Sequence, residues 1–226
     1  MSEWWTYSLS DFLLFSPKAY DRMLELYNRA MWPAQIVAMA FGLTIWAILN
    51  RSFRWRGRFV AAILAGTWLW IAIAFHAERY SRINWAARDF AWGFALEGVL
   101  LIGLSFARRR PAHEPAAWIR RLGLGMFLFG LWAQPLVGWV SGRPWRQAET
   151  FGTAPDPTAV ATLGVLLFGS GPGYRVAAVV PVLWCGISGA TLLAMKSRVE
   201  SITLITAALA AGIAICCAPS TNRGSS

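Results

Sequence analysis

Long apolar runs that approach the thickness of a bilayer dominate this sequence. They cover about residues 33–50, 59–77, 84–107 and 122–140, with short polar loops between them. A helix needs roughly 20 mostly apolar residues to cross the hydrocarbon core of a membrane. Backbone groups left unpaired in lipid are costly, so runs of this kind fold as helices. The sequence therefore predicts an all-α fold, a polytopic transmembrane helical bundle.

The composition also indicates a membrane protein. Hydrophobic residues make up 57% of the 226 residues and charged residues only 14%, against roughly 25% charged residues in an average protein. The net charge of +10 would suggest nucleic acid as the partner of a soluble protein. Here the arginines lie in short loops between apolar runs, where membrane topology accounts for them. We therefore expect the lipid bilayer as the partner, and no nucleic acid.

Two loops carry most of the basic residues and predict the orientation. Cytoplasmic loops of membrane proteins are enriched in Lys and Arg. Both loops are therefore expected inside and the N-terminus outside, in the inner (plasma) membrane of a bacterium. The arginines that set this topology are Arg51, Arg54, Arg56 and Arg58 in the first loop, and Arg108, Arg109, Arg110, Arg120 and Arg121 in the second.

The apolar run that follows Pro157 is short. It ends near Phe168, at a Gly-Ser-Gly-Pro-Gly sequence, and a helix that rises about 1.5 Å per residue over this length falls short of a hydrocarbon core of roughly 30 Å. It either crosses with the help of its flanking turns or re-enters. With the runs at 174–195 and 201–218, the first alternative gives seven spans, which we favour, and the second gives six.

The chain is expected to form a single integral membrane domain over residues 1–218, followed by a polar tail over 219–226. Residues 1–31 form an interfacial segment within it. Ser16 and Pro17 fit the N-cap and the first residue of a helix. This helix is predicted to be amphipathic and to lie at the membrane interface, with an apolar face of Tyr20, Met23, Leu24, Tyr27 and Met31.

An ionisable side chain inside an apolar run is expensive and needs a partner, a cavity or a function. Glu97 lies near the middle of the run at 84–107. An antiparallel hairpin with the preceding run brings it opposite residues 64–67, where Gly66 would permit close approach and Thr67 would offer a hydroxyl. Two interpretations stay open: a structural carboxyl that is hydrogen-bonded across helices, or a site for a proton or an ion.

Polar side chains gather near the outer ends of the predicted spans. Gln35, Gln134, His76 and Glu78 belong to this group, which either lines a vestibule that opens outward or anchors the helix ends. His76 has no second histidine at ligand spacing, and the cysteines match no zinc or disulfide framework. We therefore predict no metal and no cofactor.

The sequence FGTAPDPTAVATLG at 151–164 places Asp156 between two prolines. Aspartate before proline fits an N-cap, in which the carboxylate accepts hydrogen bonds from the first turn of the helix. A short helix that begins within the membrane is also how transporters build substrate sites. In that alternative Asp156 attracts a cation, together with the carbonyl groups of residues 152–155.

Two functions of different kinds fit these features. The sequence contains no Ser/His/Asp arrangement, P-loop or HExxH helix, so no enzymatic activity is expected. The first hypothesis is a small channel or transporter for an ion or small solute, entered from outside. The second is a non-transporting accessory subunit or assembly factor, whose Trp and small residues pack against a second copy or against another membrane protein.

Five stretches spread over most of the chain are SLSDFLLFSPKAYDRMLELYN, MWPAQ, AFHAERYSRINWAA, FGTAPDPTAVATLGVLL and VVPVLW. Together they resemble a bacterial family of multi-pass membrane proteins, a domain of unknown function numbered sixty sixty-four. The resemblance implies a membrane fold and implies no activity. In the pattern of that family the residue between the two prolines is often cysteine. This chain has Asp156 there, which argues against thiol-based metal chemistry.

The predicted orientation is testable by thiol labelling. In a variant without the native cysteines, Arg54→Cys and Arg109→Cys are expected to be shielded from a membrane-impermeant maleimide in intact cells, because arginine-rich loops stay inside. Arg82→Cys, in the turn on the other side, should react. The measurement is labelling before and after the cells are permeabilised, and labelling of Arg54→Cys in intact cells would overturn the orientation.

Overall fold

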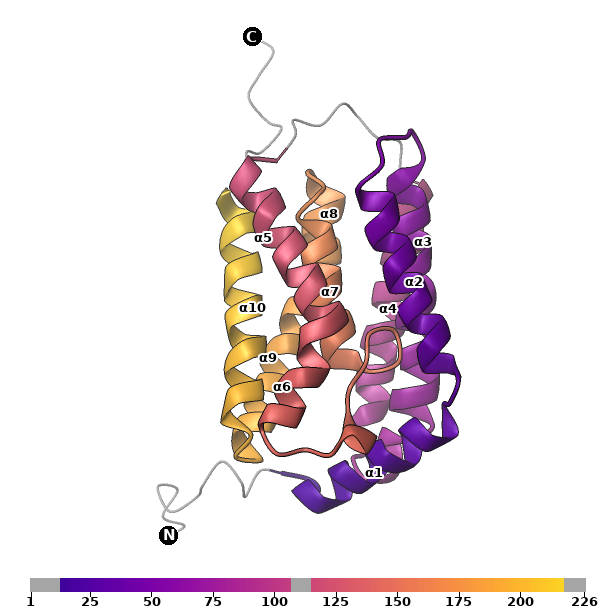
Figure 1. Cartoon of the computed structure of the whole chain (residues 1–226), viewed down its shortest axis with the longest axis vertical. Coiled ribbons are helices and arrows are strands. Elements are labelled where there is room, and N and C mark those ends of the chain that lie inside the picture. The colour runs from indigo at the N-terminus through magenta and orange to yellow at the C-terminus, as the bar shows by residue number, and fades with distance from the viewer. Residues whose placement is uncertain (1–12, 107–114, 218–226) are drawn as a thin grey trace.

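The fold is a bundle of helices that run alternately in opposite directions along its long axis (Figure 1). The computed structural model describes residues 13–106 and 115–217. Over these residues the chain forms helices and no strand, so the all-α prediction is confirmed. The first helix is α1 (Pro17–Ala30). The elements that follow are α2 (Ala34–Leu49), α3 (Arg56–Trp70), the π-helical η3 (Ile71–Ala77), η4 (Tyr80–Arg82), α4 (Ala87–Phe106), α5 (Ala117–Leu128), the π-helical η5 (Phe129–Ala133), α6 (Gln134–Val140), η6 (Trp145–Gln147), α7 (Pro155–Leu166), α8 (Pro172–Ala177), α9 (Val179–Ala194) and α10 (Arg198–Cys217).

α1 is the predicted amphipathic helix. The Ser16 hydroxyl oxygen accepts a hydrogen bond from the backbone N–H of Ala19, and Pro17 takes the first helical position, so the predicted N-cap is confirmed. A bend of 84° separates α1 from α2, and α1 therefore lies across one end of the bundle (Figure 1). Its buried face consists of Tyr20, Met23, Leu24 and Tyr27.

The hairpin of α3 and α4 brings a glycine close to the neighbouring helix. A Cβ atom on Gly98 would lie 2.7 Å from the Leu69 side chain and 3.4 Å from the Ala65 carbonyl oxygen. Gly66, which the sequence suggested for this close approach, has no atom of another described element within 4 Å of its Cβ position. The hairpin itself is confirmed, but the small residue that makes it tight is on α4.

α7 is the central helix of the bundle (Figure 1) and all of its 12 residues are buried. Glycines of α5 and η5 let the backbones touch. A Cβ on Gly123 would lie 2.6 Å from the carbonyl oxygen of Gly164, and one on Gly130 would lie 2.5 Å from that of Pro157. Because Gly130 is near the middle of the continuous helix from Ala117 to Val140, α7 begins about halfway along the bundle.

Two threonines satisfy polar groups at the start of α7. The Thr158 hydroxyl donates to the carbonyl of Ala154 (2.7 Å) and accepts from the backbone N–H of Gly152 (2.8 Å). The Thr162 hydroxyl donates to the carbonyl of Thr158 (2.7 Å) and accepts from the indole N–H of Trp68 (2.9 Å). Buried polar groups are costly when unpaired, so these contacts allow a helix to begin inside the bundle.

Several helices are long and apolar enough to cross a membrane. Within residues 13–106 and 115–217, five meet this condition, and the bent pair of α1 and α2 adds a sixth if it counts as one span. α7 does not, since its 12 residues extend only about 18 Å. The prediction of seven spans is therefore not confirmed; five or six are supported. Large apolar side chains face outward, among them Trp92, which is 78% exposed, as expected for a surface in contact with lipid.

The two arginine-rich loops share one end of the bundle. The connection between α2 and α3, the last turn of α4 and the first turn of α5 all lie opposite to α1 (Figure 1). Arg51 and Arg54 are exposed there, as are Arg120 and Arg121. Arg108, Arg109 and Arg110 lie outside the described residues, as does the tail at 219–226. The common end agrees with the predicted topology, while the side of the membrane stays a prediction.

The contact between α5 and α7 predicts the effect of a single methyl group. Gly123→Ala is expected to lower the free energy of unfolding by about 1–3 kcal/mol, because the methyl group overlaps the Gly164 carbonyl oxygen and forces the helices apart. Gly125→Ala, on the same helix, meets no atom within 4 Å and should be neutral or slightly stabilising. Unfolding in detergent is the measurement, and equal stability of the two variants would contradict this close packing.

Candidate functional site

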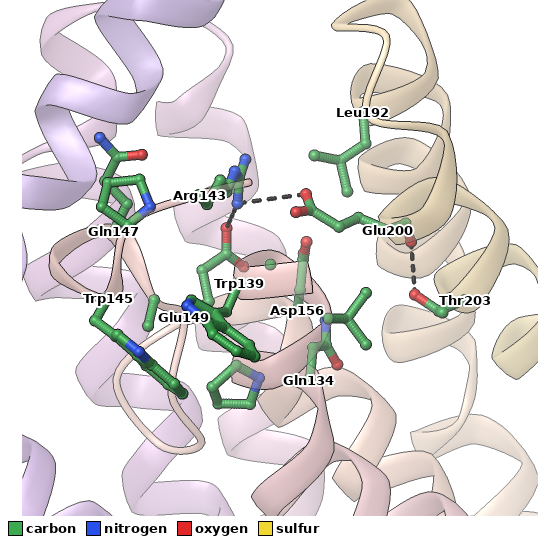
Figure 2. Close-up of a pocket in the computed structure, with 15 residues that line it drawn as sticks. Gln134, Trp139, Arg143, Trp145, Gln147, Glu149, Asp156, Leu192, Glu200 and Thr203 are labelled. Carbon is green, nitrogen blue, oxygen red and sulfur yellow. Dashed lines mark hydrogen bonds and ion pairs between the residues drawn. The ribbon is translucent and has the colours of Figure 1, made fainter. Parts of the chain in front are cut away.

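The N-terminal end of α7 borders a small cavity lined by carboxyl groups. The cavity has a volume of about 20 Å³, which is enough for a water molecule or an ion of similar size. Glu149, Asp156 and Glu200 converge on this space beside Arg143 (Figure 2). They come from three parts of the chain: the connection between α6 and α7, the first turn of α7, and the first turn of α10.

One guanidinium group links the elements around the cavity. The Arg143 guanidinium lies 3.4 Å from an oxygen of Glu149, 3.4 Å from one of Glu200 and 3.7 Å from one of Asp21. Burial by itself lowers the pKa of Arg143, but the carboxylates of Glu149 and Glu200 outweigh this effect and raise that pKa above its ordinary value. Arg143 therefore stays charged and ties α1, the α6–α7 connection and α10 together.

α1 holds the connection between α6 and α7 in place. The Tyr20 hydroxyl donates to Oε1 of Glu149 (3.1 Å), and the Tyr27 hydroxyl donates to the carbonyl of Thr153 (2.8 Å). The side-chain amide of Asn28 donates to two carbonyl groups of the same connection, at 3.0 and 2.9 Å. The amphipathic helix is thus part of the wall that positions Glu149.

Asp156 is not the N-cap of α7, so that prediction is wrong. The helix begins at Pro155, and its N-cap is Ala154, which makes no side-chain hydrogen bond. The first of the two prolines takes the first helical position, which places Asp156 inside the first turn. Its carboxylate instead accepts hydrogen bonds from the indole N–H of Trp184 (2.8 Å) and the hydroxyl of Ser188 (2.9 Å), both on α9.

The polar residues expected at the outer helix ends divide between two roles. Gln134 lines the cavity, and its amide oxygen is buried without a hydrogen-bond partner among the described residues. Gln35 donates to the side-chain oxygen of Asn28 (3.0 Å) and so joins α2 to α1. Glu78 is exposed. Gln134 thus lines a cavity and Gln35 anchors a helix end, while a vestibule that opens to the outside stays a prediction.

Glu97 and His76 are fully buried but do not line the cavity. Neither carboxyl oxygen of Glu97 and neither ring nitrogen of His76 has a hydrogen-bond partner among the described residues. The His76 ring packs against Phe94 and Trp184, at centroid distances of 4.4 and 5.0 Å. The Thr67 hydroxyl donates to a carbonyl of its own helix. The interpretation of Glu97 as a carboxyl hydrogen-bonded across helices is therefore not borne out.

Sequence reasoning did not select three residues of the cavity, namely Arg143, Glu149 and Glu200. Each lies just outside an apolar run, where charged residues are common at helix ends. Their spacing in the sequence does not distinguish them from charged residues that merely anchor helix ends. The one partial signal was that two acidic residues, Glu149 and Asp156, lie in one connection and the first turn of the helix that follows it.

Most of the chain matches a known protein family. One family model matches residues 18–224, and its description is a family of unknown function, DUF6064. The chain belongs to this family. The match includes every residue named around the cavity, so the site is part of the region that defines membership. Comparison with curated proteins and with solved structures gave no match.

Carboxyl groups outnumber cationic groups around the cavity. Three carboxyl groups and one guanidinium face it. Among the residues that the structure describes, no three His, Cys, Asp or Glu side chains are grouped to hold a metal ion. One oxygen of Glu200 and the amide oxygen of Gln134 lack a hydrogen-bond partner in the same part of the chain. The cavity thus offers acceptor atoms to whatever enters it.

The contacts of Asp156 predict a difference between two substitutions. In Asp156→Asn the amide oxygen accepts from Trp184 and the amide nitrogen donates to the Ser188 hydroxyl, which can rotate to accept. The free energy of unfolding should therefore stay near that of the wild type. Asp156→Ala leaves the indole N–H and the hydroxyl unpaired in a buried site and should cost about 1–3 kcal/mol. Unfolding in detergent measures both; if Asn were as damaging as Ala, the carboxylate charge itself would be needed for folding.

Proposed function

We propose that this protein is a small channel or transporter that admits a cation or small cationic solute from the end of the bundle that carries α1. One observation carries the proposal. α7 is buried on every side, begins about halfway along the bundle, and presents its first-turn carboxylate to an acidic cavity. Helices that end inside the membrane are a recurring way to build transporter substrate sites.

The charge around the cavity favours a cation. Asp156, Glu149 and Glu200 face a single guanidinium, and that guanidinium is already engaged with two of the three carboxyl groups. Burying an uncompensated carboxylate is costly, and a positively charged ligand lowers that cost. An anion would meet the opposite balance.

We propose a topology of seven crossings with the N-terminus outside, in the inner membrane of a bacterium. The segment 148–154 enters the bundle from the end that carries α1, and α7 continues toward the opposite end (Figure 1). Together they supply the length that α7 lacks by itself. The common end of the arginine-rich loops supports a cytoplasmic position for that end.

Glu97 and His76 are proposed to belong to the inner part of the pathway. An ionisable side chain buried in a membrane without a partner is expensive and is typical of a functional site. Trp184 connects them to the cavity, since its indole N–H donates to Asp156 while its ring contacts His76. Glu97 follows one turn after Phe94, whose ring packs on His76.

Flux in proteoliposomes tests this function. The purified protein is expected to move at least one of a panel of monovalent cations, including sodium, potassium and methylammonium. Asp156→Asn should lose most of that flux, because it keeps the hydrogen bonds of the site and removes the charge. Glu25→Gln, a partly exposed glutamate of α1 that pairs with Arg22 on the surface, is the matched control. Absence of flux for every cation, or equal flux in Asp156→Asn, would contradict the proposal.

Flux of a second variant and copurification from native membranes separate the remaining alternatives. Glu97→Gln should fold normally but lose flux if the carboxyl carries a proton or contacts the cation, since an amide cannot exchange a proton. An accessory subunit or assembly factor would instead copurify from native membranes with a stoichiometric partner and would show no flux by itself.

A further inference from the structure

Two acceptor atoms of residues that line the cavity have no donor among the described residues. Glu200 is 9% exposed; its Oε2 pairs with Arg143 while its Oε1 has no partner among the described residues. Oε1 of Gln134 is also buried and unpaired in that part of the chain. Nη2 of Arg143 is an unpaired donor among the described residues. Unpaired buried acceptors are costly, so the site is suited to a ligand that brings donors.

Two tryptophan rings form an apolar wall on the exposed side of the cavity. The rings of Trp139 and Trp145 are stacked, 6.0 Å apart and 19° from parallel. Each is 55% exposed, and both line the cavity (Figure 2). An aromatic face attracts a cation and also covers alkyl groups. This wall therefore favours a cation with an apolar part.

The number of acceptors favours an ammonium group over a metal ion. Calcium takes six to eight oxygen ligands and magnesium requires a near-octahedral set, and no three suitable side chains are grouped for that purpose among the described residues. A primary ammonium has three N–H donors. Glu200, Gln134 and Asp156 line the cavity and each contributes a side-chain oxygen.

We propose that the cavity binds a protonated primary amine, with the ammonium group among Glu200, Gln134 and Asp156 and a short alkyl group against Trp139 and Trp145. This inference rests on the proposed function and deepens it by naming the class of solute. The volume of about 20 Å³ fits the ammonium head alone. The alkyl group accordingly extends toward the exposed tryptophans.

Isothermal titration of the purified full-length protein in detergent tests the proposal. Ethylammonium chloride is expected to bind saturably, and sodium and potassium chloride at equal ionic strength should bind at least about tenfold more weakly. Tetramethylammonium, which has no N–H donor, should also bind more weakly, because it keeps only the attraction to the aromatic rings. Sodium or potassium binding as tight as that of ethylammonium would overturn the proposal.

Matched variants identify the contacts. Glu200→Gln should weaken ethylammonium binding by about tenfold or more, because a neutral amide replaces the negative charge that faces the ammonium group. Trp145→Leu should weaken it by about two- to fivefold. Glu25→Gln and Trp118→Leu are the controls; Glu25 pairs with Arg22 on α1, and Trp118 is 50% exposed and does not line the cavity. Unchanged affinity in Glu200→Gln would overturn the proposal.

A further variant covers the case in which Glu200→Gln disturbs Arg143 and the fold. Gln134→Leu removes an acceptor that no donor of the described chain uses, so it should fold normally and weaken ethylammonium binding by about three- to tenfold. Unchanged affinity there counts against the proposal in the same way. Flux without ethylammonium binding would refute this inference and leave the transporter proposal standing. Ethylammonium binding without flux of any cation would refute the transporter proposal and leave the amine site standing.

Discussion

A helix enclosed on every side by other helices has no water to pair with its polar groups, and α7 is such a helix. Its backbone can sit at the centre only because glycines such as Gly123 on the neighbouring helix leave room for direct backbone contact. Its side chains then supply the missing hydrogen bonds: Thr158 and Thr162 pair with nearby backbone and with an indole, and Asp156 pairs with α9. The close packing of the bundle follows from this requirement.

The buried charge of Arg143 is a second constraint on the structure. A charge taken out of water must be paired, and the partners of this guanidinium come from α1, from the connection before α7 and from α10. The same contacts bring Glu149 and Glu200 next to Asp156. Pairing of the buried Arg143 thus brings two carboxyl groups to the cavity, and Asp156 adds a third. The carboxyl groups there outnumber the guanidinium.

Glu97 and His76 are the two buried polar side chains in the described part of the chain for which no polar atom has a hydrogen-bond or ion-pair partner. Elsewhere a buried hydroxyl or indole near the centre has a partner, as for Thr162 and Trp184, whereas these two side chains have none among the described residues. Both lie on helices that cross the bundle, and His76 lies in a π-helical segment. Such segments often occur at functional sites. Burying these unpaired polar groups lowers the stability of the fold, which argues that Glu97 and His76 have a role other than stability.

The sequence by itself determined the membrane-type helices, the amphipathic α1 with its Ser16 cap, and the importance of the segment around Asp156, because apolar periodicity and capping are local properties of the chain. It predicted Asp156 as the N-cap, whereas Asp156 lies in the first turn of α7. Pro155 and Pro157 both fit a first helical position, and only packing decided between them. Tertiary structure alone decided that Gln134, Arg143 and Glu200 surround Asp156. These residues are distant in the chain and each looks like an ordinary helix-end residue, so their convergence depends on how the helices pack, which no local pattern encodes.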